Sequence, residues 1–273
     1  PGVMRGWRRP TILLAEAAGT TDLLIDGRLE LAISTGANAA FDAVFGAVDT
    51  DARTEAKRRQ ARFLSAIAGE VLHTVVSPGQ GAPQGAELRV TPHSPTLRSR
   101  IRQGSASLNS AVQAAELGIG LISGTVQHDH AEGETFGQYQ ARIIEAFRAT
   151  WRTTWGTEPP SVAVAASILV GTTAELREKY AAYDLERRTI GIAASRPKGA
   201  LAPASQPAGA QISPVFQGTP DQVIEAVLND PGLAAADEVV LFLPPAFGLA
   251  ENIRLLTDLA ETVAPGLGWS PAS

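Results

Sequence analysis

The segment that decides the fold is residues 100–123, RIRQGSASLNSAVQAAELGIGLIS. Arg100–Gly104 is typical of a short strand, Leu108–Leu117 of a helix built from small residues and closed by Gly118, and Ile119–Ser123 of a second strand. A strand, a helix and a strand in succession form the unit of a parallel sheet with crossover helices. The segment therefore predicts an α/β fold.

The same alternation continues on both sides of this segment. Two segments carry signals of a helix start. Thr172 and Glu175 have the spacing of a capping box, and Thr219 is followed by a proline at the first helical position and by Gln222 at the third. Five strands can be placed, whereas a closed (β/α)8 barrel needs about eight. Five parallel strands with an open edge would form a doubly wound sheet instead, and the pattern alone leaves both architectures open. The remaining predicted strands are Arg28–Ser34, Val162–Val170 and Glu238–Leu243, and the remaining predicted helices are Thr11–Leu24, Asp51–Gly69, Glu134–Trp155 and Glu251–Val263.

Two stretches interrupt the alternation. Residues 71–98 contain scattered Gly and Pro between short strand-like runs, which predicts a hairpin-like excursion on the surface. Ala194–Phe216 is rich in Pro, Gly, Ala and Ser, and such a stretch is either an interdomain linker or an active-site lid. Because strands and helices flank it on both sides, we predict a lid loop within a single domain spanning residues 1–273.

Composition excludes several classes of function. The chain has 273 residues, is 44% hydrophobic and carries a net charge of −5, which argues against nucleic-acid binding. It contains no cysteine, so disulfides and thiolate chemistry are excluded. Its apolar runs are too short to cross a membrane as a helix, and no signal peptide is recognisable. We therefore expect a cytoplasmic protein with no membrane partner.

A phosphate-binding site is predicted where two neighbouring strands end. Gly104, Ser105 and Ala106 lead from a strand directly into a helix, whose first N–H groups can bind an anion. The next strand ends in residues 123–125, Ser123-Gly124-Thr125, and adjacent loops of this kind build phosphate sites in barrels. The alternative is that Ser105 or Ser107 merely caps the helix.

The run His128-Asp129-His130 is the other cluster with chemical potential. Its spacing matches no helical HExxH or closed zinc pattern, so a polar loop before a helix is expected and no metal is assigned. His128 is the one candidate for a proton donor or substrate ligand, and no catalytic residue is otherwise assigned.

Several phrases resemble the luciferase-like monooxygenase family, and they occur in the family's order over nearly the whole chain. The segments that resemble motifs of that family are residues 9–18, Asp22–Leu24, Asp26–Leu31, Arg100–Ser105, Ala114–Gly118 and Gly218–Val223.

The resemblance implies a luciferase-like (β/α)8 barrel, a TIM barrel that is N-terminally incomplete because the chain holds only strands 4 to 8. It implies a cofactor, FMN or the deazaflavin coenzyme F-420, whose phosphate is held by Gly104, Ser105 and Ala106 together with residues 123–125. It also implies a small-molecule substrate, NAD(P)H or a flavin reductase as electron source, and a homo-oligomer, expected to be a dimer.

The expected function is thus a flavin- or deazaflavin-dependent oxidoreductase of the monooxygenase type, acting on a small organic substrate. The alternative is a non-catalytic flavin-binding or interaction protein that keeps a partial barrel. A partial barrel exposes sheet edges, so such a protein needs a partner or self-association.

Overall fold

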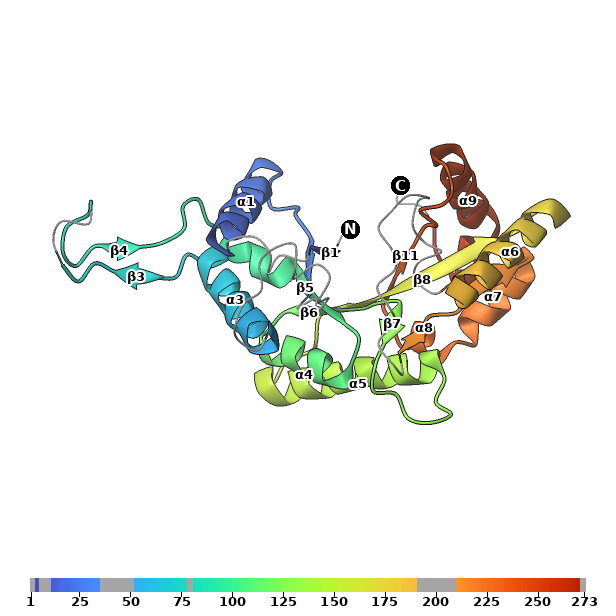
Figure 1. The fold of residues 1–273 in the computed structure, drawn as a ribbon, viewed down its shortest axis with the longest axis horizontal. Coiled ribbons are helices and arrows are strands. Elements are labelled where there is room, and N and C mark those ends of the chain that lie inside the picture. The colour runs from blue at the N-terminus through green and yellow to red at the C-terminus, as the bar shows by residue number, and fades with distance from the viewer. Residues whose placement is uncertain (1–2, 5–10, 35–51, 78–80, 191–209, 271–273) are drawn as a thin grey trace. The chain divides into compact units, whose positions relative to one another are not determined.

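The structure, a computed structural model, describes residues 3–4, 11–34, 52–77, 81–190 and 210–270. The chain divides into two compact units, the first comprising residues 1–104 and 114–120, and the second residues 105–113 and 121–273. Each unit contains parallel strands and helices (Figure 1). The predicted α/β class is therefore confirmed. Closure into a complete barrel and a single domain over residues 1–273 stay predictions.

The first unit is built on three parallel strands. Strand β1 (Val3–Met4) pairs with β2 (Leu31–Ile33), and β2 pairs with β5 (Ile101–Ser105). Helices α1 (Thr11–Leu24) and α3 (Ala52–Ile67) pack against each other. All three residues of β2 are buried, whereas burial alternates along β5.

A hairpin extends from this unit in the stretch predicted as an excursion. Strands β3 (His73–Thr74) and β4 (Glu87–Leu88) pair antiparallel and reach away from α1 and α3 (Figure 1). The chain returns through the 3-10 helix η2 (Pro95–Arg100). At the root of the hairpin, Gly69 has a φ of +76°, and the His93 ring occupies the place a Cβ would take. Only glycine fits there.

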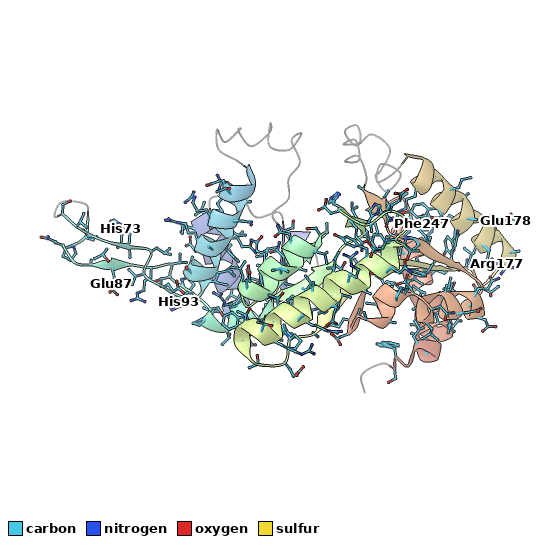
Figure 2. All side chains as sticks on the ribbon, turned by 90° about the horizontal axis from the view of Figure 1, so that it is seen from below. His73, Glu87, His93, Arg177, Glu178 and Phe247 are labelled. Atoms are coloured by element: carbon cyan, nitrogen blue, oxygen red, sulfur yellow. The ribbon has the colours of Figure 1, made fainter. Side chains whose placement is uncertain are left out.

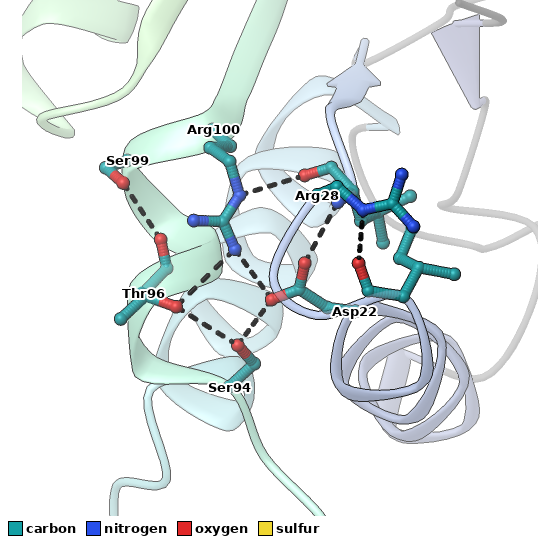
Figure 3. A network of polar contacts seen from close by, with 8 residues as sticks. Asp22, Arg28, Ser94, Thr96, Ser99 and Arg100 are labelled. Carbon is teal, nitrogen blue, oxygen red and sulfur yellow. Dashed lines mark hydrogen bonds and ion pairs between the residues drawn. The ribbon is translucent and has the colours of Figure 1, made fainter.

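Buried Asp22 ties the parts of the first unit together. Its carboxylate accepts hydrogen bonds from the Leu29 N–H (3.0 Å), the Ser94 hydroxyl (2.6 Å) and Arg100 Nη2 (2.7 Å). Figure 3 shows the carboxylate between the end of α1, η2 and the residue before β5. Burial alone would raise the pKa of Asp22, but hydrogen bonds from Ser94, Leu29 and Arg100 outweigh it and hold the pKa below its ordinary value of 3.8.

The second unit is organised around β8 (Val162–Val170). Strand β6 (Gly120–Ser123) pairs with the first residues of β8, and β11 (Glu238–Leu241) and β10 (Val215–Gly218) pair with its first and second halves, all in parallel. Eight of the nine residues of β8 are buried, as its continuous apolar sequence predicts.

The helices predicted for this part of the chain are present in the predicted order, and two short helices, α8 (Pro231–Ala234) and the 3-10 helix η4 (Ala264–Leu267), were not predicted. The predicted helices are α4 (Leu108–Glu116), which ends in the first unit, α5 (Phe136–Trp155), α6 (Ala174–Ile190), α7 (Pro220–Leu228) and α9 (Leu249–Thr262). Of the described helices, none is both long and apolar enough to cross a membrane.

Two details differ from the sequence predictions, and one is confirmed. Strand β10 was not predicted, and with β9 (Gln211–Ile212) it occupies the end of the expected lid loop Ala194–Phe216; residues 194–209 of that loop lie outside the described residues. The predicted capping box of α6 is wrong by one residue. The Thr173 hydroxyl accepts the Leu176 N–H at 3.3 Å, whereas Thr172 donates to Asp258. The capping box at Thr219 is confirmed.

Candidate functional site

Three serine hydroxyls cluster at the start of α4 in the second unit. The Ser105 hydroxyl donates to the Ser107 carbonyl at 3.0 Å and lies 2.6 Å from the Ser110 hydroxyl. The Ser107 hydroxyl accepts the Ser110 N–H at 3.4 Å, which makes Ser107 the N-cap. The sequence left Ser105 and Ser107 as alternative N-caps of this helix. Ser107 is the N-cap, whereas the buried Ser105 hydroxyl stabilises the turn through its bond to the Ser107 carbonyl.

Tyr139 of α5 lies against the same helix start. Its hydroxyl accepts the Leu108 N–H at 3.4 Å, and the ring is fully buried. Burial raises the pKa of Tyr139, so its phenol stays protonated at neutral pH. The His130 ring meets the Tyr139 ring edge-on, with centroids 6.5 Å apart. Tyr139 thus fixes the first turn of α4, a role that the sequence did not indicate.

The loop after β6 runs beside the loop after β5, as the sequence predicted. The Gly124 N–H donates to the Ser105 carbonyl at 3.1 Å, and the His128 N–H donates to the Ala106 carbonyl at 2.9 Å. These bonds bring Ser105, Ala106, Gly124 and His128 together. Gly104, the fourth residue of β5, is half-buried and precedes this turn.

Ser123 and Thr125 have other partners. The buried Ser123 hydroxyl accepts a hydrogen bond from Gln140 Nε2 of α5 at 3.1 Å, so this side chain joins β6 to α5. The Thr125 carbonyl accepts the Ser213 N–H at 2.9 Å, which joins the second loop to the chain before β10.

Histidines do not form a metal centre in the described residues. No group of three or more His, Asp or Glu side chains in that part of the chain could hold a metal ion. His73 and His93 lie on the hairpin and at its root in the first unit (Figure 2). His128 itself is half-buried, and its backbone is fixed by Ala106.

A short antiparallel ribbon continues the second loop. Strand β7 (Val126–Gln127) pairs with β9, and Gln127 lies directly opposite Gln211. Gln127 is fully buried, yet neither its amide nitrogen nor its amide oxygen has a hydrogen-bond partner in the described structure, and the same holds for Gln211 Oε1. Buried polar atoms nearly always have a hydrogen-bond partner, so the amide groups of Gln127 and Gln211 are an exception in this ribbon.

Gln211 and Ser213 also line a cavity of about 420 Å³. Arg187 of α6 forms part of its wall, and its guanidinium donates to the Ser213 carbonyl at 2.8 Å and to the Ser213 hydroxyl at 3.2 Å. Its size is within the usual range for small-molecule sites, about 300–1,000 Å³. The lining residues are Thr135, Phe136, Gly137, Asp184, Arg187, Gln211, Ile212, Ser213, Pro214 and Asp230.

No sequence motif pointed to this cavity. Arg187 and Ser213 are 26 residues apart, and part of the intervening chain lies outside the described residues. The only available signal was the spacing of Asp184 and Arg187, which places two charges on one face of α6.

The two loops suit a phosphate group chemically. Residues 104–110 and 123–128 contain four serines and a threonine but no carboxylate. The positive end of the α4 dipole lies within the same turn. A phosphate of FMN or coenzyme F-420 would meet serine and threonine hydroxyls here, whereas the N–H groups of Leu108, Gly124 and His128 already donate within the protein and Asp129 directly follows the second loop. The hydroxyl groups are compatible with the implied cofactor, and the phosphate site itself stays a prediction.

Comparison with known families gives one match. A family model described as luciferase-like monooxygenase matches residues 1–233. No curated protein sequence matches the chain at a significant level.

Solved structures share the fold at low sequence identity. The monooxygenase RslO1 from Streptomyces bottropensis is 15% identical with a TM-score of 0.69, and the match covers 97% of this chain and 77% of that one. The FMN complex of the oxygenating constituent of 3,6-diketocamphane monooxygenase from Pseudomonas putida is 14% identical, with a TM-score of 0.62 and coverages of 96% and 78%. The coenzyme F420 dependent tetrahydromethanopterin reductase from Methanopyrus kandleri is 14% identical, with a TM-score of 0.59 and coverages of 97% and 82%.

Proposed function

Because this chain belongs to the luciferase-like monooxygenase family, we propose that it is a flavin- or deazaflavin-dependent oxidoreductase of the monooxygenase type that acts on a small organic molecule. The observation that carries the proposal is the pair of loops joined by the Gly124–Ser105 and His128–Ala106 hydrogen bonds at the start of α4. This arrangement supports a phosphate-bearing cofactor at that place.

The proposed cofactor contacts follow from the chemistry of the two loops. Gly104, Ser105 and Ala106 would hold the phosphate from one side, and Ser123, Gly124 and Thr125 from the other. Since the Ser105 and Ser123 side chains bond within the protein, their contribution would be to hold the two loops in place around the cofactor phosphate. Ser107, as the N-cap, is a further hydroxyl at the same helix start.

The cofactor supplies the redox chemistry when it is bound, by passing a hydride or activating oxygen. The residues of this chain bind and orient it and exclude water from the reacting groups. His128 remains the candidate proton donor, because its backbone is fixed at the junction of the two loops. NAD(P)H or a flavin reductase would provide electrons.

The alternative function is a non-catalytic flavin-binding or interaction protein. It is favoured by an apolar stripe on α9, where Leu249, Ile253 and Leu256 are 79%, 55% and 39% exposed at helical spacing. A stripe of this kind is usually covered by a partner or by a second copy of the chain, as in the expected dimer.

Cofactor titration followed by turnover separates these functions. FMN and coenzyme F-420 are added separately to the purified chain, and binding is followed by the change in their fluorescence. Oxidation of NAD(P)H or of reduced F-420 is then measured with each bound cofactor. Binding with turnover supports the oxidoreductase, and binding without turnover leaves only the alternative. If neither cofactor binds, the oxidoreductase and the flavin-binding alternative are both refuted.

A further inference from the structure

Helix α9 presents an apolar stripe to solvent in the second unit. Leu249, Ile253 and Leu256 are exposed, and exposed Ala260 continues the row. The steps of four, three and four residues keep these side chains on one face of the helix, as along the seam between two packed helices. A different face of α9, which includes buried Leu255, contacts the rest of the unit. The four exposed residues, the α9 stripe, are therefore not part of the core of their own unit.

Helix α1 carries a stripe with the same spacing in the first unit. Leu13 and Leu24 are 57% and 78% exposed, Ala17 is exposed between them, and Thr20 is half-buried. A different face of α1 packs against α3. These four residues are the α1 stripe. Uncovered apolar surface on two helices indicates sites of protein–protein contact.

The two stripes are complementary in size when the helices are aligned in parallel. At the two middle positions the smaller residues of α1 meet large residues of α9, and at the last position a large residue of α1 meets a small one of α9. Such alternation lets facing side chains interdigitate without voids. The facing pairs are Leu13 with Leu249, Ala17 with Ile253, Thr20 with Leu256 and Leu24 with Ala260.

Charge favours the same pairing. Glu16 is the only exposed charged residue of α1, so a second α1 would offer it no cation. Arg254 is the only cation of α9, and its Nε lies 3.8 Å from Asp258 Oδ2 of the same helix, at the limit of an ion pair. Glu16 directly precedes Ala17 of one stripe, and Arg254 directly follows Ile253 of the other. In a parallel alignment these two positions border the same side of the contact, so opposite charges meet there.

The strands before these helices have edges that suit the same arrangement. Among the described strands, β1 pairs with β2 alone and β11 with β8 alone, so each has one edge without a ladder. Val239 of β11 and Phe242 just after it are exposed. Because α1 follows β1 and α9 follows β11, a parallel contact of the helices also places the two strands parallel. Sheet edges of this kind are usually paired or covered.

We propose that α1 and β1 of one copy of this chain dock on α9 and β11 of a second copy, with the two stripes packed in parallel. The occupant is a second copy because the α1 stripe matches the α9 stripe in spacing, size and charge. The contact is head-to-tail and joins two different copies, so association continues until a ring closes. The inference is independent of the proposed function, since neither stripe contains a residue of the loops 104–110 and 123–128.

Mixing two variants tests the head-to-tail contact. Leu24→Glu places a charge in the α1 stripe and Ile253→Glu places one in the α9 stripe, and both positions are exposed, so the fold should be kept. In analytical ultracentrifugation we expect the wild-type chain to associate and each variant alone to remain monomeric. An equimolar mixture should form a one-to-one dimer, because the Leu24→Glu chain keeps its α9 stripe and the Ile253→Glu chain keeps its α1 stripe.

The matched control is Leu185→Glu on α6, at an exposed leucine outside both stripes, which should associate like the wild type. A wild-type chain that stays monomeric up to about 0.1 mM would overturn the inference. Association of either stripe variant alone to the wild-type extent, or a mixture that stays monomeric, would do the same. Loss of association in the control would show that added charge, and not the stripes, governs assembly. Circular dichroism and thermal unfolding verify that each variant is folded.

A charge exchange tests the parallel alignment. Glu16→Lys and Arg254→Glu are each expected to weaken association by up to about fivefold, the usual range for an exposed ion pair. The chain with both substitutions has an opposite pair across the contact again and should recover the wild-type dissociation constant. A double variant without such recovery would overturn the parallel pairing of α1 with α9.

The outcome can be separated from cofactor binding. A chain that associates as expected but binds neither FMN nor F-420 would refute the proposed function and leave this contact standing. A chain that binds a cofactor but stays monomeric would refute only the contact.

Discussion

Replacing Asp22 by Asn should destabilise the first unit by about 2–3 kcal/mol. Asp22 is fully buried and accepts three hydrogen bonds, two of them on the oxygen that meets Ser94 and Arg100. The amide that replaces this oxygen cannot accept from Arg100. Removing one partner of a fully buried ion pair destabilises by about 3–5 kcal/mol. The Arg100 side chain is 25% exposed, so water solvates its charge in part. We therefore expect the smaller loss of stability that is typical of a hydrogen bond to a charged group, about 2–3 kcal/mol.

Urea unfolding followed by circular dichroism measures this effect at pH 7. The control is Asp26→Asn, because Asp26 is exposed and its left-handed φ of 56° suits Asn, so a change of at most about 0.5 kcal/mol is expected. If Asp22→Asn is no more destabilising than this control, the network in Figure 3 does not hold the unit together.

The effect should also depend on pH. Since the folded-state pKa of Asp22 is below the ordinary 3.8, the charged carboxylate stabilises the fold fully above pH 3.8. That contribution is lost as the pH falls through the folded-state pKa. The difference between the wild-type chain and Asp22→Asn should therefore be constant from pH 7 to about pH 5 and shrink toward pH 2. A difference that grows on acidification would contradict the assignment.

Three further substitutions test local packing, each by thermal unfolding. Gly137→Ala should destabilise by about 1–3 kcal/mol, because its Cβ would overlap the Asp230 carboxylate; an unchanged melting temperature would show that α5 and α8 are not in this contact. Ser123→Ala should cost about 1–2 kcal/mol by removing the acceptor of the buried Gln140 amide, and the loss should be smaller in a Gln140→Leu background. Thr173→Ala should lower the free energy of unfolding by about 1 kcal/mol, because the N-cap of α6 is lost. An unchanged melting temperature would show that Thr172, and not Thr173, caps this helix.

Much of the second unit follows from local sequence patterns. The apolar run of β8 and the Thr219 capping box were placed correctly because each depends on residues close together in the chain. The adjacency of the loops after β5 and β6 was also predictable, since the carboxyl ends of neighbouring parallel strands meet at one edge. The Gly124–Ser105 hydrogen bond is the direct result of this geometry.

The remaining features depend on contacts that the sequence does not encode locally. Strand β10 is four residues long and follows Pro214 in a stretch rich in turn-forming residues, so only its pairing with β8 makes it a strand. The shift of the cap from Thr172 to Thr173 depends on Thr172 having Asp258 as a distant partner. The Arg187–Ser213 wall of the cavity joins two segments that share no motif.

The measurement that tests the central claim most directly is the cofactor affinity of Ser107→Asp. Aspartate is as good an N-cap as serine and suits the helix dipole, so α4 should stay folded. A carboxylate about 5 Å from a doubly charged phosphate is repelled by about 1.7 kcal/mol at the dielectric constant of water. Salt screening reduces this repulsion to about 1 kcal/mol, which predicts roughly fivefold weaker binding. The matched control, Thr219→Asp, puts the same charge at the N-cap of α7 and should leave the affinity unchanged. Equal affinities of the two variants for FMN or F-420 would show that the start of α4 does not hold the cofactor phosphate.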